Sequence, residues 1–143
     1  MNLSEHFTLE QLIFSETALR LDIDNVPNAL EIEKLRWLAS YLDEVWDVIG
    51  PFHVTSGFRC LALNRALRSS DTSQHVRCEA ADCQSADRLT PLEMCRRVSR
   101  SLLPFDQCIY EFQAWMHISF TQGSPRGMLL TIDRTGARQG LPA

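Results

Sequence analysis

The chain has 143 residues, the usual size of one domain, and 45% of them are apolar while 22% are charged, which excludes a fibrous or disordered protein. The formal charge of -4 argues against a nucleic-acid partner, because domains that bind nucleic acid usually carry a basic stripe. No apolar stretch approaches the roughly 20 residues needed to cross a bilayer, and residues 1–7 lack a basic region followed by an apolar run. We therefore expect no membrane insertion and no export signal, so that the protein is cytoplasmic as synthesised.

Three helices and a short helical segment are predicted in the first two thirds of the chain. Thr8 and Gln11 form a capping pair that begins a helix ending near residue 15. Apolar residues then recur at helical spacing until Gly50-Pro51, which predicts a core-packed helix over 28–49. A short helical segment over 61–67 and a helix that starts at Thr90 follow.

Five runs have the character of strands, at residues 52–55, 79–83, 107–111, 115–120 and 128–132. Helices first and strands later predict an α+β fold in which N-terminal helices pack on a small antiparallel sheet. We expect one domain over residues 1–133 and a flexible tail over 134–143, which is rich in Gly, Arg and Pro.

Two histidines and one aspartate are candidate metal ligands. His75 and Asp82 are seven positions apart in a segment that can fold back on itself. In the run 115–120 the two-residue period of a strand places His117 away from the most apolar face. Two imidazoles, one carboxylate and an open fourth position are typical of a catalytic zinc site. A packed, hydrogen-bonded His117 is the alternative interpretation.

The five cysteines offer a rival metal site. Their odd number and irregular spacing predict free thiols and no disulfide framework. Cys78 and Cys83 together with His75 could hold a structural zinc ion, although no second cysteine pair accompanies them.

Several separated motifs resemble one enzyme family. They are Ser4-Glu5-His6-Phe7-Thr8-Leu9, Ile23-Asp24-Asn25-Val26-Pro27, Thr55-Ser56-Gly57-Phe58-Arg59, Leu63-Asn64, Ser73-Gln74-His75, Ala80-Ala81-Asp82 and Trp115-Met116-His117-Ile118-Ser119-Phe120. Together they resemble the zinc D-alanyl-D-alanine carboxypeptidases, in particular the short phage and bacterial branch related to L-alanyl-D-glutamate endolysins and hedgehog-type domains. The resemblance implies that His75, Asp82 and His117 bind zinc.

The resemblance also implies two catalytic residues. Arg59 matches the arginine that binds substrate and stabilises the oxyanion, for which a planar, permanently charged guanidinium is suited. Glu111 is the nearest match to the general base, although several relatives place their acid three residues before the last histidine, where this chain has Ala114. A surface ion pair for Arg59 and a solvated strand-end position for Glu111 are the structural alternatives.

Three further residues are candidates for orienting a ligand or the substrate. Ser73 and Gln74 precede the first ligand, and Ser119 follows the last one on the same strand face.

The chain departs from the family pattern at Cys78, where relatives usually carry glycine, and in residues 68–72, which lack an expected glycine pair. A Cβ atom penalises positive φ, so Cys78 is expected to distort the loop or to bring its sulfur near the metal.

The resemblance implies zinc-dependent hydrolysis of an amide bond in a peptidoglycan stem peptide, either as a carboxypeptidase or as an endopeptidase. It also favours a phage or prophage protein that acts on the cell wall after release or as a virion component. The alternative is a catalytically impaired cell-wall-binding or virion assembly module that keeps the fold.

Overall fold

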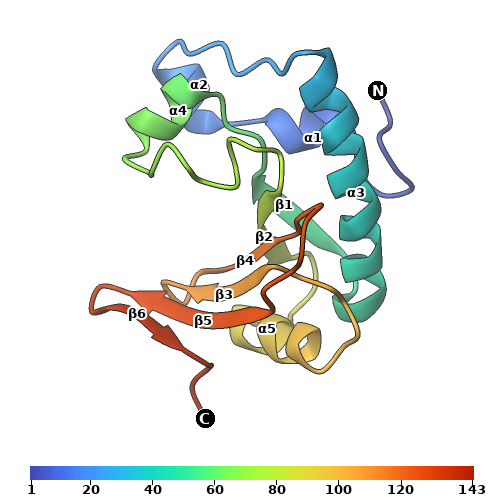
Figure 1. Ribbon diagram of the computed structural model, residues 1–143, viewed down its shortest axis with the longest axis vertical. Helices are drawn as coiled ribbons and strands as arrows, with labels where there is room; N and C mark the ends of the chain where they lie inside the picture. Colours follow the sequence, from blue (N-terminus) through green and yellow to red (C-terminus); the bar gives the residue numbers. More distant parts are fainter. The chain divides into compact units, whose positions relative to one another are not determined.

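The computed structural model describes residues 1–143 as five helices and six strands (Figure 1). The helices are α1 (Leu9–Ile13), α2 (Glu16–Arg20), α3 (Ala29–Ile49), α4 (Leu61–Ala66) and α5 (Pro91–Ser99). The strands are β1 (Phe52–Ser56), β2 (Ala80–Ser85), β3 (Gln107–Glu111), β4 (Trp115–Ser119), β5 (Met128–Asp133) and β6 (Gly136–Gln139). They form one sheet in the order β1-β2-β4-β3-β5-β6, which confirms the predicted α+β class.

The chain divides into two compact units, one of residues 1–43 and 54–81 and the other of residues 44–53 and 82–143. In the first unit the predicted capping box of α1 is present, because the Thr8 hydroxyl accepts from the Gln11 N–H and the Gln11 side chain accepts from the Thr8 N–H. Asn28 and Glu31 form the same reciprocal pair at the start of α3. These local bonds satisfy N–H groups that a helix leaves unpaired at its first turn.

The segment that follows β1 lies directly against the end of α1. The Phe58 N–H donates to the Leu12 carbonyl at 2.8 Å, and a Cβ atom on Gly57 would lie 2.4 Å from that same oxygen. Only glycine permits so close an approach of two backbones. The Asn25 side chain ties the same segment down, since its amide donates to the Phe58 carbonyl at 3.0 Å and its oxygen accepts from the Cys60 N–H at 2.7 Å.

The second unit consists mainly of β3 to β6 and α5. β3 pairs antiparallel with β4, and β5 pairs antiparallel with β6. β3 and β5 pair in parallel, so the sheet is mixed where a purely antiparallel one was expected. α5 packs on β3 and β4 (Figure 1). The loop before β5 is fixed by Asp106, a buried carboxylate whose Oδ1 and Oδ2 both accept from the Arg126 guanidinium.

Two elements were not expected from the sequence. α2 is a helix of five residues that begins at Ser15, whose hydroxyl accepts from the Ala18 N–H. β6 lies within residues 134–143, the segment for which a tail was expected, and it pairs with β5. None of the helices combines the length and the apolar character that crossing a membrane requires.

Candidate metal centre

His75 lies in a tight loop between α4 and β2. The Ser73 hydroxyl accepts from the His75 N–H at 3.2 Å, and the Ser73 carbonyl accepts from the Val76 N–H at 3.1 Å. The loop is closed by a bond from the Glu79 N–H to the Gln74 carbonyl at 2.9 Å. Because these bonds fix the backbone on both sides of His75, the imidazole projects from a rigid support.

The imidazole of His75 is oriented by the backbone of the Ser-Gly turn. Its Nδ1 lies 2.8 Å from the carbonyl oxygen of Gly57, which can only accept, so Nδ1 carries the proton. Nε2 then presents its lone pair, the form in which histidine binds a metal. The backbone N–H of Arg59 donates a hydrogen bond to the His75 carbonyl at 3.2 Å, which connects the two segments. Carbonyl support of this kind fixes the tautomer of metal-binding histidines.

Asp82 and His117 project from β2 and β4. Asp82 Oδ1 lies 2.9 Å from His117 Nδ1. Both residues are buried, since Asp82 is 5% exposed and His117 is 8% exposed. Two donors bound to one tetrahedral zinc ion at about 2.0–2.1 Å would lie about 3.3 Å apart. The observed separation is therefore close to that of two ligands of the same ion.

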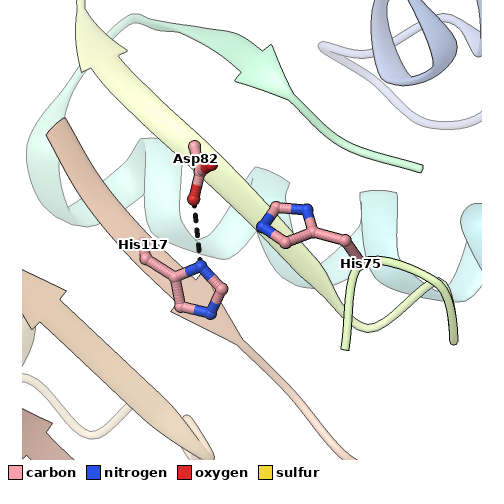
Figure 2. A group of neighbouring side chains, drawn as sticks. All are labelled: His75, Asp82 and His117. Atoms are coloured by element: carbon pink, nitrogen blue, oxygen red, sulfur yellow. Dashed lines mark hydrogen bonds and ion pairs between the residues drawn. The ribbon is translucent and has the colours of Figure 1, made fainter. Parts of the chain in front are cut away.

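All three predicted ligands converge. One donor atom each of His75, Asp82 and His117 lies within 4.8 Å of the others, and Figure 2 shows the three side chains directed toward a common point. A carboxylate and two imidazoles gathered in a buried position are costly unless a partner compensates them. A divalent cation does so, and this donor set is the one that catalytic zinc uses. The residues present therefore fit a zinc ion.

A buried glutamate that the sequence analysis missed supports the His75 loop. Glu79 is 7% exposed, and its carboxylate forms ion pairs with Lys34 at 3.5 Å and with Arg77 at 3.1 Å. The Gln74 amide donates to the same carboxylate at 3.4 Å. Since Lys34 belongs to α3, the ion pair anchors the loop to the longest helix. The one feature of the sequence that could have indicated this role is that Glu79 follows His75 by four positions.

Glu111 ends β3 on the face that carries His117. The strand register pairs Glu111 with Trp115 and Ile109 with His117, and residues directly opposite in a sheet share a face. Glu111 is therefore the diagonal neighbour of His117, at a Cα separation of roughly 7–8 Å. It is partly buried and not a fully solvated strand end. The expected shared face of Trp115, His117 and Ser119 is present as well.

Arg59 is held in place by two neutral side chains. Its Nε donates to Ser56 Oγ at 3.1 Å and its Nη1 donates to Asn64 Oδ1 at 3.4 Å. Asn64 is completely buried and its amide donates to the Ser70 carbonyl, so the guanidinium rests on a rigid partner.

The hydroxyl groups of the two candidate serines bond to backbone. Ser73 accepts from the His75 N–H, as described, and so positions the ligand through the chain and not through the imidazole. The buried Ser119 hydroxyl accepts from the Gln107 N–H at 3.0 Å, at the start of β3. Contacts of Ser73, Gln74 and Ser119 with a substrate stay predictions.

Cys78 has a positive φ, the conformation that favours glycine. Its φ is +60°, and its side chain is 1% exposed. Burial, together with the negative charge of Glu31, raises the pKa of the Cys78 thiol to about 12, so it stays protonated at neutral pH. Cys83 follows Asp82 within β2, and consecutive strand residues point to opposite faces. The group that the structure brings together contains no cysteine, so the rival cysteine zinc site is not formed.

Comparison with known families agrees with this geometry. A family model described as Peptidase M15 matches residues 5–119, which include every residue discussed in this site. No curated protein matches the chain. The M15 peptidases are zinc-dependent, and the buried group of His75, Asp82 and His117 could bind the metal. The chain belongs to the M15 family of zinc peptidases.

Proposed function

We propose that the protein hydrolyses an amide bond in a peptidoglycan stem peptide, with His75, Asp82 and His117 as the zinc ligands. The observation that carries the proposal is the convergence of these three donors within 4.8 Å in a chain that belongs to a peptidase family. The stem peptide as substrate rests on the resemblance to D-alanyl-D-alanine carboxypeptidases and L-alanyl-D-glutamate endolysins. The same resemblance supports a phage or prophage protein that acts on the wall after release or as part of a virion.

The bound metal would supply a Lewis acid that polarises the scissile carbonyl and lowers the pKa of water to about 7. The His75 imidazole keeps its Nε2 lone pair toward the site because Gly57 holds the Nδ1 proton. Asp82 contributes the negative charge that two neutral imidazoles lack. With these three side chains as ligands, a bound zinc ion would have a position open for water or for the substrate carbonyl.

Glu111 is proposed as the general base. Its position on the strand face of His117 supports this role, in which the carboxylate would take a proton from the attacking water. The same proton is then delivered to the amine that leaves when the C–N bond breaks. General base groups of this kind contribute typically 10²–10⁴-fold to the rate.

Arg59 is proposed to bind the substrate carboxylate or the developing oxyanion. Its bonds to Ser56 and Asn64 fix the guanidinium before the substrate arrives, so little side-chain entropy is lost on binding. A donor that is already ordered stabilises charge in the transition state without reorganisation.

The test is a digest of purified peptidoglycan with the zinc-loaded protein, read by mass spectrometry. We expect new amine and carboxyl ends, their loss with a chelator and their return with added zinc. The mass of the products identifies the bond that is cut. The Glu111→Gln variant should lose the products, and Glu33→Gln, an exposed substitution on α3, should keep them. If zinc is bound and the peptidoglycan stays uncut, the result would instead favour the cell-wall-binding or virion assembly module.

A further inference from the structure

A concavity of about 420 Å³ lies at the sheet end where β3 and β5 finish. It is lined by Phe112, Gln113, Asp133, Arg134 and Thr135. The parallel register pairs Glu111 with Ile132, so the turn after β3 and the turn after β5 start side by side. Phe112, the first lining residue, directly follows Glu111, the proposed base, and the Cα atoms of two consecutive residues lie about 3.8 Å apart. The concavity therefore begins next to the proposed base.

The turn between β3 and β4 presents an aromatic ring at a backbone position that disfavours one. Phe112 and Gln113 have φ of +52° and +58°, values that two-residue hairpin turns usually assign to Asn and Gly. Phe112 is 48% exposed, and its ring packs on Trp115 with centroids 5.7 Å apart. Strained positions of this kind cluster at ligand sites. The Phe112 ring thus extends the face of Trp115, His117 and Glu111 into the concavity.

The polar lining carries an exposed positive charge that has no partner within the protein. The Asp133 carboxylate is already engaged, because it accepts from Arg138 at 2.8 Å and from the Thr135 hydroxyl at 2.6 Å. These donors hold the pKa of Asp133 well below its usual range. By contrast, Arg134 makes no hydrogen bond or ion pair, and neither does the Gln113 side chain. An unpaired guanidinium beside a free amide favours an anionic ligand with a planar carboxylate.

We propose that this concavity binds a part of the peptide substrate that carries a free carboxylate, with that carboxylate on Arg134 and an adjoining apolar portion on the Phe112 ring. The inference rests on the proposed peptidase function and adds a specificity site to it. The register places Arg134 two strands away from His117 and four residues further along the sheet, roughly 16 Å between Cα atoms, so the carboxylate lies about three to five residues from the cleaved bond. Gln113 contributes a second donor to the same group.

Two matched substrates test the proposal. One is a stem peptide with a free α-carboxylate on its D-glutamyl residue, and the other is the same peptide with a carboxamide there. We expect the zinc-loaded wild type to cleave the acid form with a kcat/KM about 2–5-fold higher, the size of an exposed ion pair. Arg134→Gln should abolish this ratio, and Arg20→Gln, an exposed and equally unpaired arginine of α2, should retain it. Phe112→Ala should raise KM for both peptides with little change in kcat.

Equal rates for the two peptides, or a ratio that survives in Arg134→Gln, would overturn this inference while leaving the peptidase function intact. Failure of the wild type to cleave either peptide would count against the proposed function, and binding then decides the inference separately. In an NMR titration the acid peptide should shift the amide signals of Gln113 and Arg134 more than the carboxamide does. Equal shifts, or shifts produced only by a hexosamine oligomer, would contradict a carboxylate site.

Discussion

Cys78 offers a quantitative test of the strained loop that carries His75. Its φ of +60° places a Cβ atom where L-residues pay about 1–2 kcal/mol. Both Cys78→Ala and Cys78→Gly remove the buried sulfur, so their difference isolates the effect of the Cβ atom. Glycine loses about 0.8 kcal/mol of methyl burial and about 0.4–1 kcal/mol through the freedom of the unfolded chain. Relief of the strain offsets these losses, and the two variants should be about equally stable.

Cys95 provides the matched control, because it is completely buried within the helix α5. At this position the backbone is helical, so a glycine substitution relieves no strain. Relative to alanine it loses the burial of one methyl group and about 1 kcal/mol of helix propensity. Cys95→Gly should therefore be less stable than Cys95→Ala by about 1.8 kcal/mol.

The assay is urea unfolding of all four variants at saturating zinc, with thermal unfolding as a second readout. A difference of 1 kcal/mol corresponds to about 2–4 °C in Tm for a chain of this size. If glycine proves as unfavourable relative to alanine at position 78 as at position 95, the strain assigned to Cys78 is wrong.

Three further predictions follow from the site and its support. Glu111→Gln should lower kcat by about 10²–10⁴-fold with zinc content unchanged by metal analysis, and a loss of zinc would show that Glu111 is structural. Gly57→Ala places a Cβ atom 2.4 Å from the Leu12 carbonyl, so it should lower Tm. It should also weaken zinc binding, because the Gly57 carbonyl orients His75. A Tm and a zinc affinity that both stay unchanged in calorimetry would refute the close approach. The folded Cys78 pKa of about 12 exceeds the ordinary value of 9.0, so between these pH values the unfolded state loses the proton first and stability should fall by about 1.4 kcal/mol per pH unit. Cys78→Ala should reduce that slope in urea titrations, whereas an unchanged slope would place the titration elsewhere.

The sequence predicted most elements because their signals are local. The capping pair at Thr8 and Gln11 and the strand over residues 107–111 depend on neighbours in the chain, and both are present as expected. β6 was missed because all four of its residues are exposed, so no alternation of apolar and polar residues marks it. The parallel pairing of β3 with β5 depends on a loop that Asp106 and Arg126 fix, and such a long-range contact leaves no periodic pattern.

The donor set of the site was predictable, whereas its support was not. His75, Asp82 and His117 stand in separated motifs whose order resembles a known family. The carbonyl of Gly57 acts through the backbone, whereas the carboxylate of Glu79 acts through ion pairs with Lys34 and Arg77 that form only in the folded chain. Any residue type supplies a carbonyl, so a support of this kind cannot be recognised from residue identity.

The most direct test of the account is anomalous diffraction at the zinc edge from crystals of the zinc-loaded protein. The account predicts one strong peak at about 2.0–2.2 Å from a nitrogen of His75, an oxygen of Asp82 and a nitrogen of His117. A peak on the cysteine sulfurs instead, or no ordered zinc at these three residues, would contradict it.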